Sequence, residues 1–457
     1  MWNLCPKLRA VATASPPPLE GRPIMKNNTL LVVGGGVAGT MAVIAAVSRG
    51  FDVTWVADRI SPHDQSAHWH GHLHRGRLYD PERETDLIDE LSCNASFWWS
   101  DAIRPFHTGT PTIAIGPDER WATSFRERLT GPRWHQSRTS FLRSDTTAVG
   151  TDEAILDGPA FLDAAYRAAL RGAAHILGRC DSLRLRSDGS WSADISAALG
   201  GHLEVTAAGV ILATGAAVPE LVPDEVNLDL RFGARLSRML VLRGTLPRTA
   251  AIVPSRAAGG LFFASREIVD DPSGRARAWL VSDGFSSPGT DSPGDLTDGW
   301  WSCSVIERLL RFVREEVLED VAVSGYLATK FRLASSPAQV PAKGVSVDLE
   351  HSFVALAPSK WSTAPTSAIN AIDAIVSDPL AVDDRIDAMA RLVGAEAVEP
   401  LSRFDETWQT LTKWVPFTSL TTPGLDSLET AASIYQQEHG SVVAQSIWRP
   451  VRGGAGA

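Results

Sequence analysis

The stretch TLLVVGGGVAGTMAVIAAVSRGFDVTWVAD, residues 29–58, decides the fold of this chain. Its apolar run, residues 30–33, is typical of a parallel strand that is buried on both faces. The run leads into the pattern Gly-x-Gly-x-x-Gly, formed by Gly34, Gly36 and Gly39. In this pattern the first glycine permits a tight turn, the second lets the backbone approach a pyrophosphate, and the third lets a helix pack against the strand.

The residues after the turn complete a dinucleotide-binding pattern. Val37 and Ala38 open the predicted helix, whose free N–H groups and partial positive charge would face the phosphates. A second strand, residues 52–57, ends in Asp58, 19 residues after Gly39. A carboxylate at that distance can accept hydrogen bonds from a ribose diol, so the stretch predicts a dinucleotide site.

The bulk properties restrict the class of protein. The 457 residues are 44% apolar and 21% charged, which is ordinary for a globular enzyme, and the chain is long enough for two domains. A net charge of −10 without long basic runs argues against a nucleic-acid partner. The longest apolar run, residues 37–47, is too short for a membrane span. Four cysteines without a CxxC pair or metal-type spacing favour a reducing, cytoplasmic location.

Several later segments have clear patterns. Asp157-Gly158-Pro159 predicts the start of a helix that runs to about residue 172, and residues 209–215 predict another buried strand that ends in a small-residue turn. Thr363 is a plausible N-cap for a helix that runs to residue 376. Further helices are expected over 81–97 and 304–317, and further strands over 112–116, 182–187, 190–197, 202–206 and 343–358.

In their order along the chain these segments resemble the FAD-dependent D-amino-acid oxidase superfamily, of the glycine oxidase and glycerol-3-phosphate dehydrogenase type. The resemblance is carried by the GGGVAG turn with Asp58 and by the segments HLHRGRLY, DGPAFLDAAYRAALRGA, VILATGA and SKWSTAP, together covering about residues 29–376. It implies an α/β fold: a Rossmann-type, GR2-like FAD-binding domain with an inserted antiparallel β-sheet cap domain and C-terminal helices.

The expected division of the chain follows from this resemblance. Residues 1–25 form a disordered extension, and 26–230 form the first part of the FAD-binding domain. Residues 231–330 form the substrate or cap domain, 331–380 complete the FAD-binding domain, and 381–457 form a C-terminal helical segment.

The resemblance also implies cofactor contacts. The cofactor is expected to be FAD, held by Gly34, Gly36, Val37, Ala38, Gly39, Asp58, His70, Gly71, Thr214, Gly215, Lys360, Trp361 and Ser362. An alternative alignment compares His68-Trp69-His70 with the dimethylglycine dehydrogenases, in which the histidine bonds covalently to the flavin. One departure stands out, because Ala357-Pro358-Ser359 occupies a place that is glycine-rich in the family.

The candidate catalytic residues are His74, His72 and Arg332. A histidine beside the flavin could accept a substrate proton during hydride loss, and an arginine could hold a substrate carboxylate. His70, His72 and His74 would share one face of a strand, a possible metal geometry. No carboxylate or cysteine cluster accompanies them in the sequence, so no metal is expected.

The resulting prediction is an FAD-dependent oxidase or dehydrogenase that moves a hydride from a C–N or C–OH carbon of a small polar substrate to flavin N5. Two alternatives are a monooxygenase or halogenase and a redox-neutral flavoprotein. The monooxygenase pattern is disfavoured because no late GD motif and no second Gly-x-Gly-x-x-Gly are present. The sequence does not specify the electron acceptor, which could be oxygen, a quinone or a protein.

Overall fold

The computed structural model describes residues 28–58, 66, 70–76, 85–115, 140–228, 231–253, 261–267, 277–283, 299–319, 321–334, 344–358, 360–376, 382–397, 415–416 and 449–450. The expected extension over residues 1–25 lies outside this part. In the described chain no helix is both long enough and apolar enough to cross a membrane.

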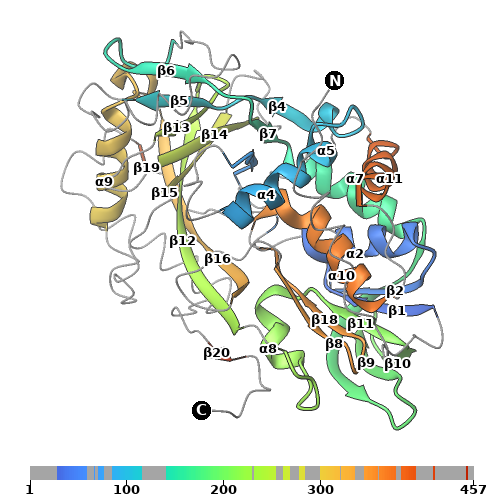
Figure 1. The fold of residues 1–457 in the computed structure, drawn as a ribbon. Helices are drawn as coiled ribbons and strands as arrows, with labels where there is room; N and C mark the ends of the chain where they lie inside the picture. Colours follow the sequence, from blue (N-terminus) through green and yellow to red (C-terminus); the bar gives the residue numbers. More distant parts are fainter. Residues whose placement is uncertain are drawn as a thin grey trace.

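An eight-stranded sheet forms one half of the molecule (Figure 1). Its centre is parallel, because a buried apolar run such as Leu30–Val33 can pack against layers on both faces. The parallel strands, in order across the sheet, are β8 (Ala173–Leu185), β2 (Asp52–Ala57), β1 (Thr29–Val33), β11 (Gly209–Leu212) and β18 (Phe353–Leu356). Antiparallel strands extend both sides: β9 (Trp191–Ala197) and β10 (His202–Ala207) beyond β8, and β17 (Val345–Asp348) beyond β18.

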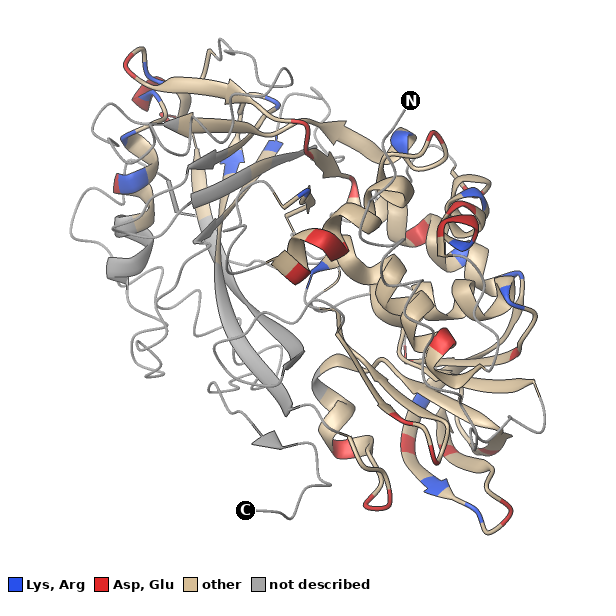
Figure 2. Ribbon diagram, viewed as in Figure 1, with Lys and Arg blue, Asp and Glu red and all other residues tan. Residues whose placement is uncertain are grey.

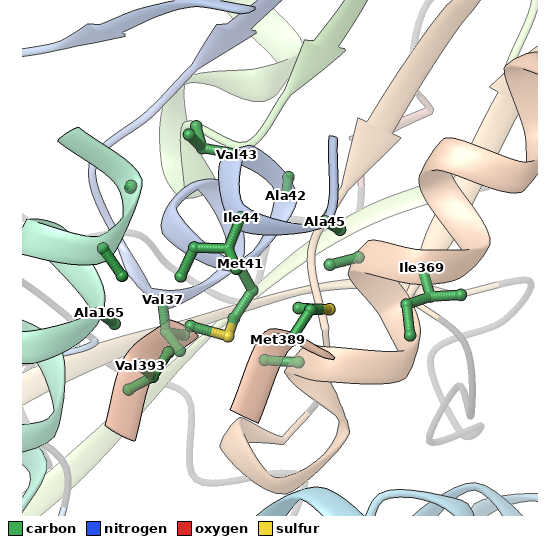
Figure 3. Packing of buried hydrophobic residues seen from close by; sticks show 14 of the residues in the cluster. Val37, Met41, Ala42, Val43, Ile44, Ala45, Ala165, Ile369, Met389 and Val393 are labelled. Carbon is green, nitrogen blue, oxygen red and sulfur yellow. The ribbon is translucent and has the colours of Figure 1, made fainter. Parts of the chain in front are cut away.

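Four helices cover one face of this sheet: α2 (Val37–Ser48), α7 (Gly158–Leu170), α10 (Ala364–Ile375) and α11 (Val382–Gly394). Helix α2 is the hub, since it is apolar nearly all round and its central residues, 41–46, are at most 1% exposed. Figure 3 shows Met41 of α2 close to Met389 of α11, with side chains of α7 and α10 around them. Burial of one such side chain contributes roughly 1.5–3 kcal/mol, so this layer fixes α2 on the sheet.

A nine-stranded sheet forms the other half, on the left of Figure 1. Its strands are β12 (Arg231–Gly244), β13 (Ala250–Val253), β14 (Leu261–Glu267), β15 (Arg277–Asp283), β16 (Ala322–Ala334), β5 (Thr112–Ile115), β6 (Thr147–Gly150), β19 (Val415–Pro416) and β20 (Arg449–Pro450). Helix α9 (Gly299–Leu310) packs Val305, Ile306 and Leu309 against the same apolar cluster as Trp279 of β15.

A small third sheet contains β3 (His72–Leu73), β7 (Ala154–Leu156) and β4 (His107–Gly109). Beside it, α4 (Thr85–Cys93) and α5 (Ala95–Trp98) lead into the short helix η1 (Arg104–Phe106). The other short helices are η2 (Gly215–Ala217), α8 (Val218–Leu221), η4 (Glu315–Val317) and η5 (Trp361–Thr363). Charged residues of both signs are interspersed over both halves of the described ribbon (Figure 2).

The structure differs from the sequence-based expectations in several elements. The helix expected over 81–97 is described as α4 and α5, and the one expected over 304–317 is α9 followed by η4. Thr363 precedes α10, but its hydroxyl donates to the carbonyl of Lys360 instead of capping the helix. Beyond α11, the described parts of the expected C-terminal helical segment are residues 395–397 and the short strands β19 and β20.

The expected domain limits also differ from the sheet membership. Strands β5 and β6 fall within 26–230, yet they belong to the nine-stranded sheet because β5 pairs with β13. Strand β16 continues past residue 330 to Ala334, paired with β12 along its length. Both differences come from pairings between segments far apart in the sequence, which local patterns do not reveal.

Helix α7 offers a direct stability test. Its start at Gly158 is as expected, and Asp157 Oδ1 accepts the N–H of Ala160 at 3.2 Å. Replacing Asp157 with alanine removes this cap and is expected to lower the free energy of unfolding by about 1 kcal/mol, measured by denaturant unfolding. The control Asp157→Asn keeps an oxygen acceptor and should remain near wild type. Equal stability of the alanine variant would show that this cap contributes nothing.

Candidate active site

The turn between β1 and α2 brings three backbone segments into contact. Gly34 has φ 127°, and a Cβ added there would lie 2.4 Å from the carbonyl oxygen of Ala213. A Cβ on Gly39 would lie 2.0 Å from the carbonyl oxygen of Gly34. Neither position can hold a larger residue without moving backbone, so the glycines are required for strand β1, helix α2 and the end of β11 to meet.

Trp55 of β2 fixes this turn from the side. Its buried indole Nε1–H donates to the carbonyl oxygen of Gly34 at 2.9 Å. The ring packs on Tyr166, whose hydroxyl is 2.8 Å from Nε2 of His175. Burial, and next the negative charge of Asp58, raise the pKa of Tyr166 to about 12. Asp58 therefore acts on this cluster from the end of β2, the position where the sequence predicts a ribose ligand.

Ser66 was not predicted from the sequence. Its hydroxyl oxygen accepts the N–H of Val37 at 3.1 Å, at the first residue of α2. It also lies 3.1 Å from the Cβ that a side chain at Gly36 would carry. A serine in a polar stretch carries no local signal, because its role depends on the chain returning to the helix N-terminus. The hydroxyl lies where a phosphate would meet the helix, with Ala38 in the same first turn.

The end of β11 carries Thr214 and Gly215, where η2 begins and Gly215 has φ 57°. The Thr214 hydroxyl is buried, and within the described part of the chain no hydrogen-bond partner is found for it. An unsatisfied buried hydroxyl is costly, and a ligand oxygen can satisfy it. With the side-chain-free turn and the helix N-terminus, it makes a cradle that fits the pyrophosphate end of a dinucleotide.

One of the predicted histidines, His72, contacts the carboxylate of Glu153. His72 and Glu153 are each about 1% exposed, with His72 Nε2 and Glu153 Oε2 separated by 2.6 Å. The rings of His72 and His74 are 3.9 Å apart between centroids, and those of His70 and His72 are 6.2 Å apart. The backbone N–H of His72 donates to His70 Nδ1 at 3.2 Å. Gly71, with φ 87°, accepts the N–H of Leu156 and so joins this segment to β7.

Glu153 corrects one sequence-based inference. The histidines were expected to have no carboxylate neighbour, yet the atoms of His72, His74 and Glu153 that could bind a metal lie within 4.8 Å of one another. Glu153 is 81 residues from His72 in the chain, and the contact forms because β3 pairs with β7. The only local signal is an acid immediately before a short apolar run, which is too common to be diagnostic.

Arg75 is held beside the same segment. Its guanidinium NH1 donates to Asp152 Oδ2 at 3.1 Å, and its Cζ lies 4.0 Å from the centroid of the Trp99 ring. Its backbone N–H donates to Glu153 Oε1 at 2.9 Å. The adjacent acids Asp152 and Glu153 therefore fix both the side chain and the backbone of Arg75.

The SKWS turn meets the histidine segment from the other side. Ser362 Oγ accepts the N–H of His74 at 3.1 Å, and its carbonyl oxygen accepts Trp98 Nε1–H at 2.8 Å. The Trp361 ring is only 8% exposed and packs in the aromatic core with Phe161. Lys360 lies at the start of η5, where its carbonyl accepts from Thr363. The turn thus brings Ser362 to His74, while the Trp361 ring is part of the core.

Arg332 and His107 lie on strands other than the His72–Leu73 strand. The backbone of Arg332 lies in β16, opposite Gly233 of β12, and its side chain lies outside the described part. His107, which the sequence did not single out, lies near Trp99 and Arg75. Burial lowers the pKa of His107, whose Nε2 lies 2.9 Å from the carbonyl oxygen of Trp98. His107 therefore has a structural contact on the same small sheet.

Comparison with known proteins gives the family context. A family model described as FAD dependent oxidoreductase matches residues 29–325. L-α-glycerophosphate oxidase from Mycoplasma pneumoniae, with FAD bound, is 14% identical with a TM-score of 0.54 over 77% of this chain and 97% of that chain. Fructosamine oxidase from Aspergillus fumigatus is 14% identical with a TM-score of 0.53 over 83% and 92%. Glycerol-3-phosphate dehydrogenase from Bacillus halodurans, complexed with FAD, is 15% identical with a TM-score of 0.51 over 78% and 67%. At these identities the structures show likeness of fold. No curated protein sequence matches the chain.

The cradle can be tested by adding one methyl group. Gly39→Ala places a Cβ against the carbonyl of Gly34, so α2 must shift and flavin content should fall by at least tenfold, measured as bound flavin per folded protein after purification with added FAD. Gly109→Ala is the matched control, because a Cβ there meets nothing within 4 Å. Full flavin content in the Gly39 variant would contradict the role of this turn.

Proposed function

Because this chain belongs to the family of FAD-dependent oxidoreductases, we propose that it removes a hydride from a carbon bearing an amine or a hydroxyl group in a small polar substrate. Its cofactor is FAD, as in the family. When bound, the flavin supplies the hydride acceptor, and the protein supplies binding, orientation and electrostatics.

The cofactor-binding role is assigned to residues that follow the carboxyl ends of the central parallel strands of the eight-stranded sheet. The turn from Gly34 to Gly39, with Val37, Ala38 and Ser66, would hold the pyrophosphate, and Asp58 would hold the ribose. Thr214 and Gly215 would complete this end through the buried hydroxyl and the adjacent backbone. His70, Gly71, Lys360, Trp361 and Ser362 are assigned to the flavin end, with Trp361 acting through its backbone because its ring lies in the core.

The observation that carries the proposal is the place of His74. Its backbone N–H donates to Ser362 Oγ at the turn before α10, and its half-buried ring contacts the tilted ring of His72. An alcohol that loses a hydride from its carbon must also lose its hydroxyl proton, and an ammonium substrate must lose a proton from nitrogen before the hydride can leave. A neutral imidazole can accept either proton. We assign this role to His74 and a supporting role to His72. Lys360 and the N-terminus of α10 offer positive potential for developing negative charge.

We assign to Arg332 the binding of a substrate carboxylate, because this residue lies in strand β16 of the cap sheet. We also propose a cytoplasmic location, because Cys93 and Cys180 are free thiols in the described chain. The electron acceptor is left open among oxygen, a quinone and a protein.

A first experiment tests the flavin and the reaction class together. The absorbance spectrum of purified protein is recorded before and after acid precipitation, and colour is expected to move to the supernatant. Colour that stays with the pellet would show a covalent bond between flavin and protein, with His70 as the first candidate.

The flavin-loaded protein is then mixed, in the absence of oxygen, with amino acids, N-methyl amino acids, hydroxy acids and glycerol phosphates. Bleaching by one of these classes supports the proposal. Bleaching only by NADPH would favour a monooxygenase.

His74→Gln is expected to slow bleaching by about 100- to 10,000-fold, because glutamine cannot take the substrate proton. His202→Gln is the matched control, since His202 is an exposed residue of strand β10. Wild-type rates in the His74 variant would remove His74 from the chemistry.

A further inference from the structure

Among the described residues Glu153 is the most deeply buried carboxylate, and both of its oxygens make hydrogen bonds. Oε2 lies 2.6 Å from His72 Nε2, and Oε1 accepts the backbone N–H of Arg75 at 2.9 Å. Its own N–H donates to Thr151 Oγ1 at 3.3 Å, and the Thr151 hydroxyl donates to the carbonyl of Pro111 at 2.7 Å. A carboxylate with 1% exposure is stable only when its charge is matched by such donors.

The geometry between His72 and Glu153 favours a proton over a metal ion. Two ligands of one metal at about 2.0–2.1 Å would be separated by roughly 3 Å or more, which is longer than the 2.6 Å contact. The rings of His72 and His74 are in contact, with centroids 3.9 Å apart and planes tilted by 49°. The second carboxylate oxygen is already occupied by the N–H of Arg75. Glu153 therefore forms hydrogen bonds with His72 and Arg75, while His74 contacts His72 through its ring.

We propose that Glu153 is a positioning residue that fixes the protonated nitrogen and the orientation of His72 and, through the contact between the two rings, fixes the position of His74. An ionised carboxylate only accepts hydrogen bonds, so His72 Nε2 must carry the proton that lies between them. The same carboxylate accepts the backbone N–H of Arg75. Its two oxygens therefore hold the residues on both sides of His74, namely the side chain of His72 and the backbone of Arg75. The His70 ring is fixed as well, because its Nδ1 accepts the backbone N–H of His72. That nitrogen must therefore be unprotonated.

This arrangement predicts an unusual effect of an isosteric change. Glu153→Gln keeps the shape but offers one oxygen and one NH₂ group. If the oxygen accepts from the N–H of Arg75, the NH₂ group faces His72, and His72 must move its proton from Nε2 to Nδ1. If the oxygen accepts from His72, two donors oppose each other at Arg75. A buried donor without an acceptor is costly, so the first arrangement is expected.

Histidine ¹⁵N NMR of the flavin-loaded protein tests this. With ¹⁵N-labelled histidine, and with His72→Gln to assign the signal, wild-type His72 is expected to show a proton on Nε2. In Glu153→Gln the Nε2 resonance should move to the unprotonated position and Nδ1 to the protonated one. Asp152→Asn is the matched control, since it removes the neighbouring carboxylate from Arg75 and should leave His72 unchanged.

Three outcomes would overturn the proposal. One is a wild-type His72 without a proton on Nε2, a result that needs no variant to fold. Another is a folded, flavin-loaded Glu153→Gln protein with His72 unchanged. The third is stoichiometric zinc or iron in the purified protein that is lost in Glu153→Gln, which would assign a metal site instead.

The consequence for catalysis rests on the proposed function of His74. With a substrate that bleaches the wild-type flavin, Glu153→Gln is expected to lower the maximal rate of bleaching by about 100-fold, the cost of misplacing a reacting group by about 1 Å. The substrate concentration at half-maximal rate should change little, and Asp152→Asn should stay within about threefold of wild type. An unchanged rate for Glu153→Gln would overturn the positioning of His74. Failure of every substrate class would leave the NMR result intact, so the two proposals can fail separately.

Discussion

The close approach of backbone at Gly34, Gly39 and Ala213 is the constraint on which the rest of the structure depends. At these points the end of β1, the first turn of α2 and the end of β11 are separated by less than the space of one methyl group. Because α2 is the hub of the apolar layer formed with α7, α10 and α11, its distance from the sheet sets the position of all four helices. The indole N–H of Trp55 then satisfies the Gly34 carbonyl that this approach would otherwise bury without a donor.

A second level of organisation comes from polar groups between the two large sheets. The small sheet of β3, β7 and β4 is too short to be stable through its own ladder. It is held by side chains that bond to backbone: Glu153 to Arg75, Ser362 to His74, and Thr151 to Pro111. Every one of these contacts joins segments at least 40 residues apart in the chain. These hydrogen bonds position the histidine segment of the candidate active site, and the aromatic core of Trp98, Phe161 and Trp361 lies behind it.

The sequence was informative where structure is local. The strand, glycine turn and helix from Thr29 to Ser48 follow from period and turn chemistry, and Asp157 marks the start of α7 through its capping side chain. The resemblance to the flavoprotein family is confirmed over residues 29–325. The contact of His72 with Glu153 could not be predicted, because it depends on the pairing of β3 with β7. For the same reason the pairing of β5 with β13 was missed. Thr363 and Trp361 show that a motif position does not determine what its side chain contacts.

The order of strands has a consequence for synthesis of the chain. Strand β11 pairs on one edge with β1, but its other edge pairs with β18, which begins at Phe353. About 140 residues must therefore be added after Leu212 before that edge can be covered, and at ~5–20 residues per second this takes about 7–28 s. During this interval an apolar strand with an unpaired edge is open to other nascent chains, which is a recognised route to aggregation. Translation speed and chaperone supply would then influence how much folded protein a cell accumulates.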